Sequence, residues 1–345
     1  MINIKDYQKS TLVYRFRSSV DYNLDAFLKN EMYGVTPNIL NDPLDCPITY
    51  NLEILYKRLI KRKAFAQLYF NKVFIKSVKK KGFDSFETYE SYEKYQNSIF
   101  EECMLKLLDP LNASIIKEFI RSLSKTILFE VRECFAIVSF SLTIGNAVMW
   151  SHYASNYRGF VLAYDLEELY KIVNLSIEND YFLKRFNDIA GLYKVKYLEI
   201  GEMIDGTELM YELICKKMAK KYEYSDMMEF LMTSKYKGTL LTLLTTKDKS
   251  WEYEDEIRLI FPREDAWHSL NRIEGKQNEQ ICKVSNCYLP NKVIIGANMS
   301  NVTKAAIGFY CLNNPRVILQ KINIDRLMSD RCLYLTLIKP IELIK

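Results

Sequence analysis

The residues best suited to chemistry lie in one segment near the end of the chain, 251–261, in which polar and apolar residues alternate. Alternate side chains of a β-strand face opposite sides, so a strand here would bring Glu254, Glu256 and Arg258 onto one face. Like charges so placed raise the pKa of one carboxyl and leave the other ionised. That suits acid–base chemistry or stabilisation of a developing cation. The alternative is a solvated strand face with a local Glu–Arg pair.

Two other segments alternate in the manner of strands. Residues 138–142 present Ser139 and Ser141 on one face, where hydroxyl groups could hold a sugar or an amide through hydrogen bonds. Near the start of the chain, Arg15 and Arg17 alternate with two aromatic residues and form the polar face of a third strand. Each pattern is also typical of an outer strand face without a function.

Aromatic and basic residues accompany these segments. Trp150 and Tyr153 fall on a short helix expected over 146–154, where an aromatic cluster could stack on an adenine or nicotinamide ring. The alternative is a core tryptophan beside a hydrogen-bonded histidine, His152. Lys247 and Arg258 flank the glutamates and would neutralise a pyrophosphate, or merely pair with the acids.

Composition excludes several classes of enzyme. The 11 glycines include no G-x-G spacing, so the dinucleotide-binding fingerprint is absent, and neither a P-loop nor a G-x-S-x-G elbow occurs. With two histidines, the chain cannot build a site with three histidine ligands. The eight cysteines are scattered without a C-x-x-C pair, which predicts buried free thiols in a reducing compartment.

Hydropathy indicates a cytoplasmic protein that contacts no membrane. The longest apolar stretch, residues 135–142, is far shorter than the roughly 20 residues that cross a bilayer. The polar residues 1–10 do not have the pattern of a secretory signal.

The net charge of +5 has a local origin in residues 54–83, which contain ten lysines and arginines, no acidic residue and several aromatic residues. Such a segment can bind a nucleic-acid backbone. It is also typical of a solvated helix whose aromatic side chains lie in the core.

Strand-like segments come in short groups, interrupted by two helical blocks near 48–131 and 166–247. Strands and helices do not alternate regularly, which argues against a doubly wound fold. We therefore expect an α+β fold, a single domain over 1–345 in which both helical blocks are insertions.

An early arginine strand, a Ser-x-Ser strand and a late Glu-x-Glu strand together resemble the Arg-Ser-Glu class of ADP-ribosyltransferases. The resemblance implies a mixed or split β-sheet core, NAD as the substrate and no metal. It implies that Arg15 or Arg17 grips the dinucleotide and that Ser139, or the second serine of its strand, steadies the nicotinamide-ribose pocket. Glu256 would bond the ribose 2′-hydroxyl and support an oxocarbenium-like transition state, and Glu254 would act on the acceptor.

Other segments resemble the bacterial family known as domain of unknown function 2971. The matches keep the family's order across most of the chain outside the helical blocks, at 14–17, 41–45, 149–153, 159–164, 247–258 and 293–296. Because that family is uncharacterised, the resemblance supplies no function, and the long insertions depart from it.

These patterns favour an NAD-using ADP-ribosyltransferase or NAD glycohydrolase. Analogy adds a place in toxin or phage-defence biology, a protein or nucleic-acid acceptor and a regulatory partner. Two glutamates are the catalytic candidates and seven residues the cofactor-binding ones: Glu254 and Glu256; Arg15, Arg17, Ser139, Ser141, Trp150, Tyr153 and Arg258.

Three rival functions remain open. In a metal-dependent nucleic-acid phosphodiesterase, Asp42, Asp45 and the two glutamates would hold Mg²⁺; otherwise the two aspartates belong to a turn. In a non-enzymatic module, the basic segment 54–83 would bind nucleic acid or protein. A cysteine–histidine hydrolase would use His152.

Overall fold

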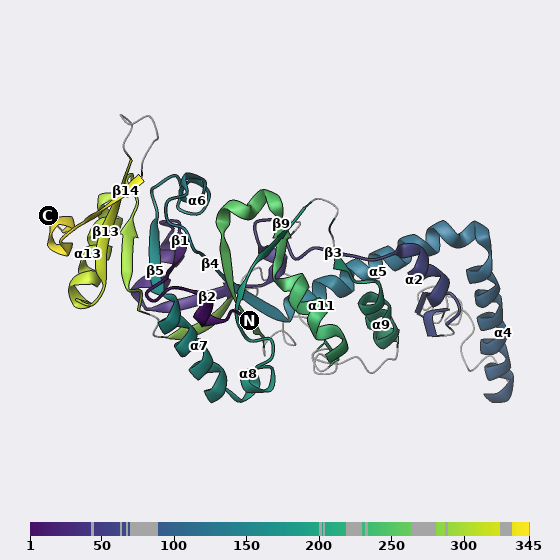
Figure 1. Cartoon of the computed structure of the whole chain (residues 1–345). Coiled ribbons are helices and arrows are strands. Elements are labelled where there is room, and N and C mark those ends of the chain that lie inside the picture. Colours follow the sequence, from purple (N-terminus) through teal and green to yellow (C-terminus); the bar gives the residue numbers. More distant parts are fainter. Residues whose placement is uncertain are drawn as a thin grey trace. The chain divides into compact units, whose positions relative to one another are not determined.

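The computed structural model describes most of the chain, namely residues 1–42, 45–62, 64–66, 68–69, 89–199, 202, 204–218, 230–231, 234–263, 281–286, 289–324 and 333–344. The chain divides into two compact units (Figure 1). Unit 1 comprises residues 1–46, 133–202 and 244–345, and unit 2 comprises 47–132 and 203–243.

Unit 1 is built on a ten-stranded, mostly antiparallel sheet with the main order β11-β2-β4-β1-β5-β12-β13-β14; β10 pairs with β4, and β6 pairs with β10. The parallel pair of β12 and β13 is joined through the helix α13 (Asn301–Asn313). The strands are β1 (Leu12–Arg17), β2 (Glu31–Val35), β4 (Phe135–Ser141), β5 (Phe160–Asp165), β6 (Gly191–Lys194), β10 (Glu256–Pro262), β11 (Ile281–Asn286), β12 (Lys292–Ile295), β13 (Ile318–Ile324) and β14 (Leu333–Leu337).

The sheet forks at β4. β10 pairs with one edge of β4 along its whole length. The other edge receives two strands, because Tyr14 of β1 pairs with Ser141 and Val35 of β2 pairs with Ile137. β1 and β2 therefore diverge from a common edge, and the short helix α1 (Asp21–Leu28) connects them. The expected α+β fold with a mixed, split sheet is confirmed.

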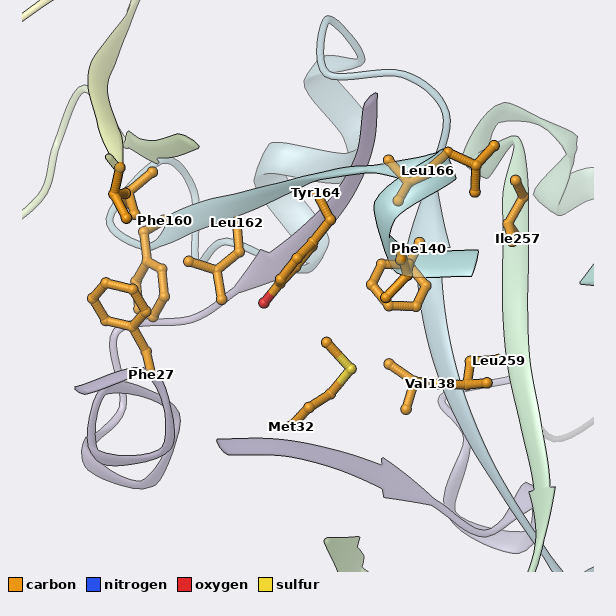
Figure 2. Packing of buried hydrophobic residues seen from close by; sticks show 14 of the residues in the cluster. Phe27, Met32, Val138, Phe140, Phe160, Leu162, Tyr164, Leu166, Ile257 and Leu259 are labelled. Atoms are coloured by element: carbon orange, nitrogen blue, oxygen red, sulfur yellow. The ribbon is translucent and has the colours of Figure 1, made fainter. Parts of the chain in front are cut away.

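One face of this sheet carries the larger apolar core. Figure 2 shows side chains from β2, β4, β5 and β10 gathered on this side, Met32, Val138, Leu162 and Leu259 among them. The helices α7 (Leu166–Asn179) and α13 add residues to the same cluster. The other face carries a smaller core around the helix α6 (Ala147–His152), with Phe16, Val161 and Ile294 from the sheet.

The segment 251–261 is not a continuous strand, so that prediction is wrong for its first half. Residues up to Glu254 form the 3-10 helix η5 (Lys249–Glu254), which Asp248 caps by accepting a hydrogen bond from the Ser250 N–H at 2.9 Å. Asp255 then adopts a left-handed conformation with φ 45°, and β10 begins at Glu256. Because of this turn, the directions of the Glu254 and Glu256 side chains are set by different elements. In a continuous strand both side chains would have pointed to the same face.

The remaining elements of unit 1 are short. They are η1 (Ile4–Asp6), η2 (Pro37–Ile39), α8 (Tyr181–Arg185), η7 (Pro340–Leu343) and the parallel two-stranded pair of β7 (Lys196–Leu198) with β9 (Thr246–Asp248).

Unit 2 is mainly helical. Its elements are α2 (Leu52–Leu59), α4 (Tyr89–Leu108), η4 (Pro110–Asn112), α5 (Ala113–Glu133), α9 (Thr207–Met218), α11 (Ser234–Leu244) and the parallel pair of β3 (Ile48–Thr49) with β8 (Ile204–Asp205). None of the helices described is both long and apolar enough to cross a membrane.

The basic segment 54–83 falls only partly within the described residues, because 70–83 lie outside them. On the described part, the Arg58 guanidinium lies 3.6 Å above the ring of Tyr211 and pairs with Glu208. The Arg62 Nε donates to the Tyr211 hydroxyl at 2.9 Å. Lys57 pairs with Glu53, so three basic residues in the described part of the segment are engaged inside unit 2. Nucleic-acid binding by the segment stays a prediction.

Candidate functional site

A cavity of about 870 Å³ lies at the fork of the sheet, within unit 1. β1, α1, β2 and β4 form one part of its wall, and the residues around η5 form another. Seven of the nine candidate site residues line it: Arg15, Arg17, Ser139, Ser141, Tyr153, Glu254 and Glu256. The sequence patterns therefore converge on one concave site.

Lys247 links three buried carboxylates at the edge of this cavity. Its Nζ lies 2.7 Å from Glu254 Oε2, 3.6 Å from Asp45 Oδ2 and 3.8 Å from Glu256 Oε2. The lysine also lies 4.6 Å from the centre of the Trp251 ring. Burial acts against its charge, but Glu256, Glu254 and Asp45 outweigh that effect and raise the pKa of Lys247. Lys247 is therefore a fixed cation that holds the carboxylates together.

Arg258, which is fully buried, anchors two of these carboxylates, Glu256 and Asp45. Its Nε donates to Glu256 Oε1 at 2.9 Å and its Nη2 to Glu256 Oε2 at 3.1 Å and to Asp45 Oδ2 at 2.7 Å. The Nη1 donates to the Leu244 carbonyl at 2.9 Å. Burial works against ionisation of Asp45, but Arg258 and Lys247 prevail and lower its pKa. Glu256 is thus held rigidly, by charge-assisted hydrogen bonds of the strong kind.

Glu254 has a different environment. Tyr153 donates its hydroxyl proton to Glu254 Oε1, and Asn41 Nδ2 donates to the Tyr153 oxygen at 2.7 Å. Burial raises the pKa of Glu254; Lys247 opposes that effect, repulsion from Glu256 adds to it, and the net shift is upward. Glu254 therefore gives up its proton at a higher pH than an ordinary glutamate does.

The two serines have separate roles in the fold. Ser141 is buried and its hydroxyl donates to the backbone carbonyl of Glu254 at 2.6 Å, which ties η5 to the end of β4. Ser139 is exposed on the part of the β4 edge between the pairings of β1 and β2. Of the two, Ser139 is the one free to meet a ligand.

The two arginines of β1 also differ. The Arg15 Nη2 donates to the backbone carbonyl of Tyr33, so its guanidinium bridges β1 and β2 across the fork. Arg17 is half-buried and, among the described residues, forms no ion pair or side-chain hydrogen bond. Burial lowers the pKa of Arg17 to about 10, which leaves it protonated at neutral pH. A charged guanidinium without a counter-ion in a cavity is suited to binding an anion.

The arginines and the serines lie on opposite faces of the sheet. Tyr14 pairs with Ser141, so these two side chains share a face with Ser139, and Arg15 and Arg17 point to the other. The cavity is lined by residues of both faces, Arg17 and Ser139 among them. An elongated ligand would therefore have to pass through the fork to reach Arg17 and the carboxylates together.

Two candidate residues do not line the cavity. Trp150 is fully buried; its ring stacks on Tyr157 at 5.4 Å, and its Nε1 donates to the Ile144 carbonyl at 2.9 Å. Arg258 is also fully buried and is satisfied by its carboxylates and the Leu244 carbonyl. The predictions that Trp150 stacks on a ligand ring and that Arg258 contacts a ligand are corrected accordingly: both residues support the site from the interior.

Some residues of the site were not among the nine candidates that the sequence predicted. In the sequence, Asp45 stood out as a turn residue or as a metal ligand of the rival phosphodiesterase. Lys247 stood out as a flanking charge that would neutralise a pyrophosphate or pair with the acids. No sequence pattern pointed to Tyr33 or Tyr197. The backbone carbonyl of Tyr33 accepts the hydrogen bond from Arg15, and the Tyr197 hydroxyl accepts one from the Glu256 N–H at 2.8 Å. Both contacts join elements distant in sequence, and no local pattern encodes such contacts.

The cluster of carboxylates is not arranged as a metal site. Within the described ranges, no group of three or more histidine, cysteine, aspartate or glutamate residues is placed to hold a metal ion. Asp45, Glu254 and Glu256 instead face the internal cations Lys247 and Arg258. The geometry thus lends no support to the phosphodiesterase alternative.

Fold and site together define an α+β protein with a charged cavity in a split sheet. Residues 149–259 match the model of a family described as protein of unknown function (DUF2971), which confirms the resemblance predicted from the motifs. The matched segment includes Tyr153, Lys247, Glu254 and Glu256. Neither the search of curated proteins nor the search of solved structures gave a match.

Proposed function

We propose that the protein cleaves the N-glycosidic bond of NAD, releasing nicotinamide and passing the ADP-ribosyl group to water or to an acceptor. The proposal is carried by one observation: the fork cavity holds two glutamates in different environments together with an arginine that has no counter-ion among the described residues. Its volume, about 870 Å³, lies in the range of small-molecule and cofactor sites.

Each part of a dinucleotide has a matching group in the cavity. The guanidinium of Arg17 suits the pyrophosphate, because arginine binds phosphate oxygens in a bidentate manner. The aromatic side chains of Tyr14, Phe16, Tyr22 and Tyr33 line the cavity and suit the planar rings. The carboxylates at the other end suit ribose hydroxyls.

Glu256 would stabilise the transition state. As the bond between the ribose C1′ and the nicotinamide ring nitrogen breaks, both electrons go to the nitrogen, and nicotinamide leaves as a neutral molecule. Positive charge develops on the ribosyl group, and the Glu256 carboxylate beside it lowers the barrier. The bonds from Arg258 to both oxygens of Glu256 keep that carboxylate oriented, so little reorganisation is needed.

Glu254 would act as the base. The attacking water or acceptor hydroxyl forms a bond to C1′ and gives up one proton, which the Glu254 carboxylate accepts. Its raised pKa makes it a stronger base than an ordinary glutamate. Tyr153 and Lys247 hold the carboxylate in place before the reaction. By analogy alone, such an activity fits toxin or phage-defence biology with a protein or nucleic-acid acceptor and a regulatory partner.

Nicotinamide release from NAD by the purified protein tests this function. We expect release by the wild type and a loss of about 10²–10⁴-fold in Glu254→Gln and Glu256→Gln. Glu252→Gln is the matched control, because Glu252 lies in the same 3-10 helix but is exposed. Circular dichroism confirms that each variant folds. No release by the folded wild type, with acceptors supplied, would refute the proposal.

A further inference from the structure

The sheet of unit 1 has three edge strands, β11, β6 and β14, which differ in how they are protected from pairing with another strand. β11 carries Lys283 and a register shift between Lys283 and Ser285. β6 is only four residues long, and the Ile2 N–H donates to its Leu192 carbonyl at 2.8 Å, so the start of the chain covers that edge. Lysines, bulges, short length and covering segments are the usual means of preventing edge-to-edge pairing.

β14, which is five residues long, has no lysine, no register shift and, within the described residues, no covering segment. Its sequence, Leu-Tyr-Leu-Thr-Leu, contains no charge, proline or glycine. Its inner edge pairs with β13, and within the described residues no strand pairs with its outer edge. Leu337 is 75% exposed and Tyr334 is 50% exposed. An uncharged, apolar edge with a free row of backbone groups is a template for another strand.

The composition of β14 makes it complementary to itself. Antiparallel pairing of two copies about Leu335 sets Leu333 opposite Leu337 and Tyr334 opposite Thr336. Apolar side chains then meet on one face and an aromatic ring meets a threonine on the other, and both are favourable cross-strand pairs. No like charges within the strand are brought together.

We propose that β14 pairs with β14 of a second copy of this chain and so joins two sheets in a two-fold symmetric dimer. The pairing is isologous, so a single strand supplies both halves of the interface. It is independent of the chemistry proposed for the fork cavity, because β14 contributes no residue to that cavity.

Sedimentation velocity of the full chain at micromolar concentrations tests the proposal. The chain has a mass of 40.7 kDa, and we expect the wild type to sediment as a species of about twice that mass. Leu335→Lys places two lysines opposite each other and should weaken association by about tenfold or more. Leu111→Lys is the control, since Leu111 is 87% exposed and lies in unit 2. A monomeric wild type, or a Leu335→Lys variant that dimerises as well as the wild type, would overturn the proposal.

Cross-linking tests the pairing itself. In the symmetric arrangement Leu335→Cys lies opposite its own copy, so mild oxidation should give a covalent dimer. Val302→Cys, on the exposed surface of α13, should give none, and oxidised wild type controls for the native thiols. Equal cross-linking of the two variants would exclude β14 as the interface.

Discussion

Arg15 of β1 donates a hydrogen bond to the backbone carbonyl of Tyr33 in β2, across the fork where the two strands leave the same edge of β4. The two strands do not pair with each other, and the guanidinium links them through a side chain. Arg17, two residues further along the same face of β1, has no such partner in the described part of the chain. The fold thus assigns one arginine to structure and leaves the other to a ligand.

Substitution of Arg15 should therefore lower stability, whereas substitution of Arg17 should abolish ligand binding. Arg15→Met leaves the Tyr33 carbonyl without its donor and should lower the free energy of unfolding by roughly 1–3 kcal/mol, measured by urea denaturation. Arg17→Met should change it by less than about 0.5 kcal/mol but abolish binding of ADP-ribose in calorimetry. Equal stability losses in the two variants would contradict the assignment.

Asp45 should be far more important for stability than a surface aspartate. Asp45→Asn breaks a fully buried pair with Arg258 and should cost about 3–5 kcal/mol. Asp255→Asn removes an exposed pair with Lys194 and should cost about 0–1 kcal/mol. Denaturant unfolding at pH 7 compares the two, and similar costs would show that the buried cluster does not stabilise the fold.

The same residue predicts a pH dependence. The pKa of Asp45 is lower in the folded chain than in the unfolded chain, where aspartate titrates near about 3.9. The unfolded state then binds more protons in the interval between the two values, so the contribution of Asp45 is complete above the unfolded value and is lost as pH falls through the folded one. Unfolding curves between pH 7 and pH 3 should fall more steeply for the wild type than for Asp45→Asn.

An ordinary glutamate has a pKa of about 4.3. Glu254 should titrate at a higher pH, because burial raises its pKa. Lys247→Met and Tyr153→Phe each remove a group that favours the carboxylate, so both should move its titration to higher pH. Lys249→Met, whose lysine pairs with Glu199 on the surface, should not. Carboxyl NMR titration makes the measurement without requiring activity. A downward shift in Lys247→Met would refute the role given to the lysine.

Gly159 is required by a close approach of two chain segments. A Cβ atom there would lie 2.0 Å from the Arg17 carbonyl oxygen, which must shift to admit it. Gly159→Ala should therefore destabilise the protein by roughly 1–3 kcal/mol. Gly145→Ala is the matched control, since nothing lies within 4 Å of the added atom, and its effect should stay below about 0.5 kcal/mol. Thermal unfolding distinguishes the two outcomes.

The sequence predicted the strands of the site better than their surroundings. Alternation located β1 and β4, since their apolar faces pack on a core as the pattern requires. It failed at Glu254, because residues 251–254 also alternate but Asp248 caps them into a 3-10 helix. It also missed that Arg15 and Ser139 face opposite sides, because the register between β1 and β4 depends on long-range pairing that no single segment encodes.

Identification of the bond that is broken tests the central proposal most directly. The purified protein is incubated with NAD, and the products are separated and weighed by mass spectrometry. Cleavage at the N-glycosidic bond gives nicotinamide together with ADP-ribose or an ADP-ribosylated acceptor, and we expect these products to disappear in Glu256→Gln but to persist in Glu252→Gln. AMP with nicotinamide mononucleotide would instead mean cleavage of the pyrophosphate, and that result would contradict the chemistry assigned to Glu254 and Glu256.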